Sequence, residues 1–248
     1  MAAFSDVTEP TASLRPPAEP EEFSQGWGLD LFNDCGDLVS PTYWVTEAYN
    51  AVFGFNPLDE VLESIAGDWE GFAKCADVWD QLGQASGALS QNITAGNATL
   101  DRTWDGRAAD GACLYFSKLA GRLDELKEEF GKLHAEYDRL THAAYSAFEA
   151  VKGYLGGIID GLLIAAVEMA AGTALSWSGA GALLGYGLAA LEITDMLSKW
   201  GLATKRIAAV QMMLNGGVGI VEGIGAAIYG LFVTFDKLGQ YDHPAATV

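Results

Sequence analysis

Apolar residues recur every three or four positions along two long stretches of the chain. The apolar or small positions of the first stretch are Leu62, Ile65, Trp69, Phe72, Ala76, Trp79, Leu82, Ser86, Leu89 and Ile93. Those of the second stretch are Phe116, Leu119, Leu123, Leu126, Phe130, Leu133, Tyr137, Leu140, Ala144, Phe148 and Val151. This heptad spacing is typical of helices packed along their length. It predicts two long amphipathic helices.

A short segment without this pattern separates the two helices. The periodicity is lost over Thr94–Asp101, and Thr103-Trp104-Asp105-Gly106 has the character of a turn. An indole can cover the ends of two helices with a large apolar body, and glycine has the backbone freedom to reverse the chain. Two amphipathic helices joined in this way bury their apolar faces on each other or on a partner. We therefore expect an antiparallel helical hairpin over residues 58–152.

The composition changes abruptly after Gly153. Residues 154–235 consist mainly of Gly, Ala, Leu and Ile, and from Met169 to Leu191 the only ionisable side chain is a tyrosine. A second apolar segment, Ile207–Phe235, follows a basic connector at Lys199–Arg206. We expect a second, Gly/Ala-rich helical hairpin here, so that the predicted fold is all-α.

Glycines in this apolar region recur at helical spacing, which lets helices approach each other closely in membranes or in tightly packed soluble bundles. The pairs are Gly157 and Gly161, Gly181 and Gly185, and Gly219 and Gly223. The uncharged run of 23 residues from Met169 is long enough to cross a bilayer. On insertion, the basic connector would prefer the cytoplasmic side. Burial in a soluble bundle against the first hairpin is the alternative, and the pattern leaves both open.

The ends of the chain have a different character. Residues 1–25 carry Pro10, Pro16, Pro17 and Pro20 among several acids, which predicts a disordered acidic tail. Residues 26–57 are aromatic-rich and irregular, with a short helix expected around 41–53, and residues 236–248 form a polar tail. The N-terminus has neither the basic region nor the apolar run of a Sec or twin-arginine signal peptide. Export would therefore need another address.

Charge and candidate chemistry narrow the function. The net charge of -19 repels phosphate backbones, so we expect no nucleic-acid partner. Cys35, Cys75 and Cys113 do not form a disulfide framework and are expected to be thiols. His134 and His142 have no further ligands at a metal-binding spacing. Because no nucleophile elbow, Walker loop or dinucleotide fingerprint is present, we expect a non-enzymatic protein without metal or cofactor.

The turn Trp104-Asp105-Gly106 between two heptad helices resembles that of the Trp-x-Gly family, whose members are helical hairpins exported by type VII (ESX-like) secretion in Gram-positive bacteria. A second family element, Tyr-x-x-x-Asp/Glu near the end of the second helix, is matched by Tyr145-Ser-Ala-Phe-Glu149. The resemblance covers residues 58–151. The N-terminal extension and the apolar C-terminal region depart from the simplest members, which are bare hairpins.

The resemblance implies several functional expectations. Family members dimerise into four-helix bundles, and the Tyr145–Glu149 element would act as an export signal, read together with the turn tryptophan of the partner chain. The expected partners are a second copy or another Trp-x-Gly hairpin protein, and the type VII secretion ATPase. We expect a secreted, non-enzymatic substrate that works by protein–protein contact and oligomerisation. The alternative is a membrane-inserting, pore-forming effector that uses the apolar helices at 154–235.

Overall fold

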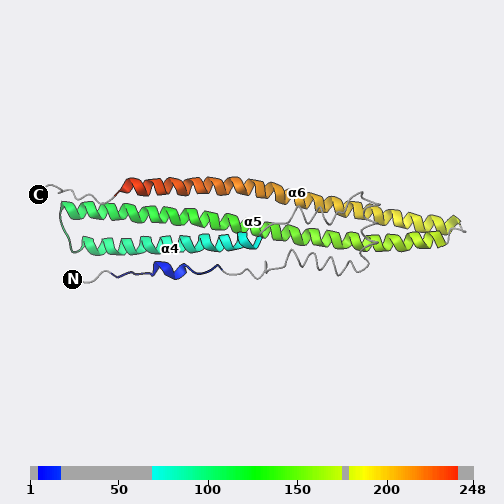
Figure 1. Ribbon diagram of the computed structural model, residues 1–248, viewed down its shortest axis with the longest axis horizontal. Helices are drawn as coiled ribbons and strands as arrows, with labels where there is room; N and C mark the ends of the chain where they lie inside the picture. The colour runs from blue at the N-terminus through cyan, green and yellow to red at the C-terminus, as the bar shows by residue number, and fades with distance from the viewer. Residues whose placement is uncertain (1–4, 18–68, 175–178, 240–248) are drawn as a thin grey trace. The chain divides into compact units, whose positions relative to one another are not determined.

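The computed structural model describes residues 5–17, 69–174 and 179–239, and these are helical apart from short connections (Figure 1). The elements are a short 3-10 helix, η1 (Pro10–Ser13), and three long α-helices, α4 (Trp69–Asp101), α5 (Arg107–Ala174) and α6 (Gly179–Leu238). The described part of the chain contains no strand. The predicted all-α fold is confirmed. The predictions for residues 26–57 and for the first residues of the hairpin, 58–68, concern residues that the structure does not describe.

The contacts divide the chain into two units. Unit 1 comprises Met1–Pro20, Glu70–Leu140 and Gly216–Val248, and unit 2 comprises Glu21–Trp69 and Thr141–Asn215. The helices α5 and α6 therefore contribute to both units. In unit 1, α4 and the first half of α5 form the antiparallel hairpin predicted from the heptad pattern, and α6 adds a third helix (Figure 1).

The core of unit 1 shows why three helices pack here. Leu126, Phe130 and Leu133 of α5 form a buried cluster with Ile228 of α6. The indole of Trp79 on α4 stacks on the ring of Phe130, with the ring centroids 5.7 Å apart. The apolar seam of the hairpin is thus covered by the C-terminal part of α6 from the same chain. Burial of this apolar area is the main force that holds the three helices together.

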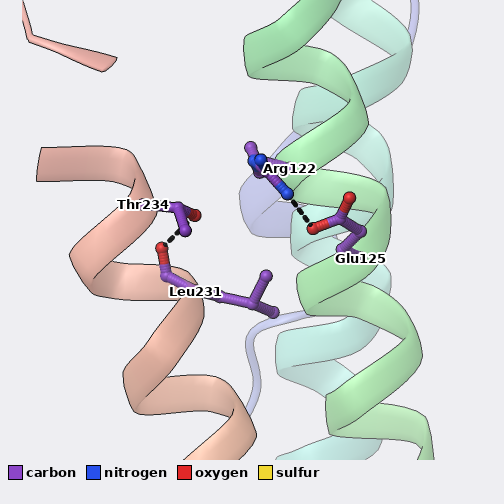
Figure 2. A network of polar contacts seen from close by, with 4 residues as sticks. All are labelled: Arg122, Glu125, Leu231 and Thr234. Atoms are coloured by element: carbon purple, nitrogen blue, oxygen red, sulfur yellow. Dashed lines mark hydrogen bonds and ion pairs between the residues drawn. The ribbon is translucent and has the colours of Figure 1, made fainter. Parts of the chain in front are cut away.

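The two polar contacts drawn in Figure 2 each stay within one helix. Arg122 donates to Glu125 of α5 at 2.7 Å, and the Thr234 hydroxyl donates to the Leu231 carbonyl of α6 at 2.7 Å. An exposed ion pair of this kind contributes less than about 1 kcal/mol. These contacts support each helix separately, and apolar packing joins α5 to α6.

In the described part of unit 2, the second half of α5 pairs in antiparallel with the first part of α6. The largest fully buried side chains in this pairing are Val151, Leu155 and Ile158 of α5 and Met196 of α6. Ala189 and Ala203 of α6 are also buried. Small and large residues thus alternate along the contact, which lets two helices interdigitate closely.

The helices do not end where the composition of the chain changes. α5 continues through Gly153 to Ala174, and Lys199–Arg206, expected as a connector, lies inside α6. The chain instead reverses between Ala174 and Gly179, which divides the uncharged run Met169–Leu191 between two helices. A change from charged to apolar residues leaves the backbone hydrogen bonds of a helix intact, whereas the weak helix formers Gly172, Thr173 and Gly179 flank the reversal.

The last turns of α4 remain helical although the apolar pattern is lost over Thr94–Asp101. Polar side chains replace the apolar contacts there. The Ser90 hydroxyl donates to the Ala120 carbonyl at 3.0 Å, and the Asn97 amide donates to the Cys113 carbonyl at 3.0 Å. These bonds attach the C-terminal part of α4 to α5. The helix therefore stays packed on α5 without an apolar repeat over Thr94–Asp101.

Part of the expected N-terminal tail is ordered on α4. The Asn92 side chain accepts from the backbone amides of Val7 (2.9 Å) and Thr8 (3.0 Å) and donates to the Thr8 carbonyl at 2.7 Å. The Gln81 side chain accepts from the Arg15 amide at 2.9 Å. The composition of this segment predicts disorder because it offers little apolar surface; residues 5–17 are held instead by hydrogen bonds from two buried amides.

Candidate interaction surfaces

The turn of the hairpin places Trp104 and Gly106 between α4 and α5. The backbone amide of Trp104 donates to the Leu100 carbonyl at 2.9 Å, which closes the end of α4, and the Asp110 amide donates to the Gly106 carbonyl at 3.0 Å in the first turn of α5. Gly106 has φ +102°, a conformation that side chains disfavour. The indole of Trp104 is 37% exposed. A partner can therefore reach it.

Tyr145 and Glu149 lie one helical turn apart on α5 within unit 2. The Tyr145 side chain is half-buried and Glu149 is exposed, whereas the neighbouring Ala144 and Phe148 belong to the buried face. The pair therefore lies at the border of the packed surface, on one side of the helix. This arrangement leaves the carboxylate open to another protein.

Three of the predicted glycines lie in the α5–α6 contact of unit 2. A Cβ at Gly161 would meet the Met196 side chain at 2.9 Å, and one at Gly157 would meet the Lys199 ammonium at 3.0 Å. That ammonium donates to the Gly157 carbonyl at 3.2 Å. Gly185 lies directly against the backbone of Gly172, since a Cβ there would be 2.6 Å from the Gly172 nitrogen. These glycines permit the close approach of the two helices.

The other predicted glycines have different surroundings. Gly219 and Gly223 are exposed on the part of α6 that belongs to unit 1, and a Cβ added to either would meet no atom within 4 Å. Gly181 is in the first turn of α6, and its contacts lie outside the described residues. The sequence spacing alone does not distinguish a glycine at a helix contact from one on an open face.

Gly217 provides a close contact that the sequence analysis missed. A Cβ at this position would lie 2.6 Å from Leu140 Cδ2 and 3.1 Å from Glu136 Oε1, both on α5 in unit 1. The buried Glu136 pairs with Arg139 one turn away at 2.5 Å. The only mark of this contact in the sequence is the adjacent pair Gly216-Gly217, which does not have the four-residue spacing of the predicted glycine pairs.

The histidine and cysteine side chains considered as candidate reactive groups lie in contacts that hold helices together or that disfavour reactivity. The Nδ1 atom of His134 lies 2.9 Å from the Ala76 carbonyl and so joins α5 to α4. Cys75 and Cys113 are thiols without a disulfide partner, and Cys35 lies outside the described residues. Desolvation, and then the nearby Asp101 carboxylate, raises the pKa of the Cys113 thiol, which disfavours the reactive thiolate. Within the described ranges, no group of three His, Cys, Asp or Glu side chains could hold a metal ion.

Helix α6 exposes many large apolar side chains, among them Leu183, Met212 and Tyr229. Both α5 and the stretch Leu183–Leu238 of α6 contain a window long and apolar enough to cross a membrane, judged by length and composition. The window in α6 has a mean hydropathy of 1.8, and only 6% of it is buried. A helix that is apolar on every side is usually buried in protein or in lipid.

No protein-family model, curated protein or solved structure matches the chain.

Proposed function

We propose that this protein is a non-enzymatic, secreted type VII substrate that acts by self-association. The observation that carries the proposal is the open small-residue face of α6 in unit 1. Gly219 and Gly223 have empty space where side chains would project. Small residues let the backbones of two helices come close together and gain extensive van der Waals contact.

This face continues along α6 at helical spacing. Exposed small residues recur every three or four positions, namely Gly216, Gly219, Gly223, Ala226 and Gly230. Exposed apolar side chains flank them, among them Ile220 and Tyr229. Since the opposite side of this segment already packs on α4 and α5 through residues such as Ile228, the small-residue face supports contact with a second copy.

Replacing Gly219 and Gly223 together by glutamine tests this contact. Glutamine is the better helix former, so the folded chain should be stabilised by about 0.5–1 kcal/mol at each site. Its long side chain would nevertheless keep a second helix away, and we expect self-association to weaken by at least about tenfold. Sedimentation velocity over a concentration series measures the effect.

Gly121→Gln is the matched control, because Gly121 of α5 is also exposed and has no atom within 4 Å of a Cβ. This variant should associate like the unmodified protein. A wild-type chain that stays monomeric at all concentrations, or a double variant that associates unchanged, would contradict the proposed contact.

The export part of the proposal is supported by the turn motif and by the Tyr145–Glu149 pair. The half-exposed Trp104 lies at the reversal between α4 and α5, and Glu149 projects into solvent one turn after Tyr145. In this proposal the secretion ATPase reads the pair together with the turn tryptophan of a partner hairpin. Both elements are accessible, as recognition by another protein requires.

Changing Tyr145 and Glu149 together to alanine should block export. Loss of the signal contacts is expected to reduce the exported fraction by at least about tenfold. Immunoblots of culture medium and cell pellet from a host with an active type VII system measure that fraction. Ser146→Ala, an exposed neighbour on α5, is the control and should be exported normally. Unchanged export of the double variant would show that the signal lies elsewhere.

A further inference from the structure

The reversal between α5 and α6 produces an uncharged helical end in unit 2. This hairpin tip consists of Met169–Ala174 of α5 and Gly179–Leu191 of α6. Glu168 precedes it on α5 and Glu192 follows it on α6. No Asp, Glu, Lys or Arg occurs between these two acids. The base of the tip is therefore marked by Glu168 and Glu192, and its far end is the reversal between Ala174 and Gly179.

The contacts between α5 and α6 show how far Glu168 and Glu192 lie from the reversal along the two helices. Gly185 lies against Gly172, and eleven residues farther from the reversal on both helices Met196 lies against Gly161. By the same pairing, Glu168 of α5 is level with Ala189 of α6. Glu192 is three residues farther along α6, or about 5 Å. The first charges on the two helices thus lie at similar heights.

The described side chains of α6 in the tip are apolar and mostly exposed. Leu183, Leu184, Leu188 and Leu191 of α6 are between 48% and 77% exposed, whereas Ala189 and Gly185 are turned toward α5. Successive positions along a helix are rotated by about 100°. These leucines lie within an arc of about 140° around the axis of α6, on the side away from Gly185 and Ala189, and the exposed Ala190 lies beside this arc.

The helix contact within the tip is also of the kind found in membranes. Gly185 packs directly on Gly172, so the two backbones touch without large side chains between them. In lipid, apolar side chains gain nothing by leaving their surroundings, and helices associate through the close packing of small residues. This contact does not depend on the burial of leucine side chains, which remain available to acyl chains.

The described part of α6 in the tip is about as long as half of a bilayer is thick. From Gly179 to the level of Glu168, α6 rises about 15 Å, and one leaflet contributes about 15 Å of hydrocarbon. A deeper position would bring Glu168, Glu192 and then Asp195 into the hydrocarbon, where each charge costs several kcal/mol. We infer that the hairpin tip inserts into one leaflet of a lipid bilayer, with Glu168 and Glu192 at the level of the headgroups.

The charges near the base of the tip determine which lipid headgroups it is expected to prefer. Asp160, Glu168, Glu192 and Asp195 are acidic, and Lys199 is the nearest basic residue on α6. Anionic headgroups would be repelled by this net negative charge, so insertion is expected to favour zwitterionic lipid and to depend weakly on salt. This inference uses unit 2 only and does not depend on type VII export or on self-association of α6.

Flotation of the full-length protein with phosphatidylcholine vesicles that contain carboxyfluorescein tests the inference. We expect the protein to float with the vesicles and the dye to remain inside. Leu184→Asp places a charge on an exposed position of the tip and should reduce the bound fraction by at least about tenfold. Leu114→Asp, at an exposed position of α5 in unit 1, is the matched control and should bind normally.

Each other result overturns part of the inference. Flotation with rapid dye release would show a spanning or pore-forming state instead of insertion into one leaflet. Absence of flotation would exclude lipid as the occupant of the tip and assign its surface to a protein assembly. Equal losses for Leu184→Asp and Leu114→Asp would show that the tip does not carry the binding.

Discussion

Replacement of Phe130 by alanine is expected to lower the free energy of unfolding by about 3–5 kcal/mol. Phe130 is buried on α5 among Leu126, Leu133 and Ile228, and it stacks on Trp79 of α4. The truncation removes apolar contacts to both other helices of unit 1 and widens the open apolar pocket of about 340 Å³ that Trp79 and Phe130 line. Urea unfolding followed by circular dichroism measures the loss.

Leu114→Ala provides the comparison, because Leu114 is exposed on the same helix. Its effect should be within about 0.5 kcal/mol, as for most surface substitutions. A similarly small loss for Phe130→Ala would mean that the cluster does not hold α4, α5 and α6 together. In that case the seam of the hairpin would be available to a second chain, as in the four-helix dimers of the Trp-x-Gly family.

Gly185→Ala should destabilise the α5–α6 hairpin of unit 2, although alanine is the better helix former. The added methyl would lie 2.6 Å from the Gly172 nitrogen and 2.8 Å from the Glu168 carbonyl oxygen. These are backbone atoms, so the helices must separate. Overpacking of this kind costs about 1–3 kcal/mol. Hydrogen exchange of peptides covering residues 155–174 and 183–199 measures the local stability.

Gly187→Ala is a matched substitution two residues away. Gly187 is exposed with no atom within 4 Å of a Cβ, so the same change should stabilise the helix by about 0.5–1 kcal/mol. The two variants are therefore expected to shift protection in opposite directions. Equal shifts would show that α5 and α6 are not in close contact at Gly172.

The N-terminal segment shows where sequence reasoning reached its limit. Proline and acidic residues predict disorder over 1–25, yet residues 5–17 lie on α4 because Asn92 and Gln81 bind their backbone groups. Nothing in the periodicity of α4 marks these two amides as binding residues. Every residue except proline has the same backbone groups, so the sequence of residues 5–17 does not show that they bind Asn92 and Gln81. This attachment is seen only when both segments are placed in the structure.

The sequence by itself determined the helical class, the turn at Trp104–Gly106 and, among the described residues, the packed face of both helices in the first hairpin except at Leu89, which is exposed. These follow from local rules, because side chains three or four positions apart share one side of a helix. The tertiary structure alone decided that α6 covers the seam of that hairpin and that the apolar run Met169–Leu191 is split between two helices. It also separated Gly185, which packs on Gly172, from Gly219 and Gly223, which face open space. Glycine spacing is the same in each case, and only the position of the neighbouring helix distinguishes a contact from an exposed surface.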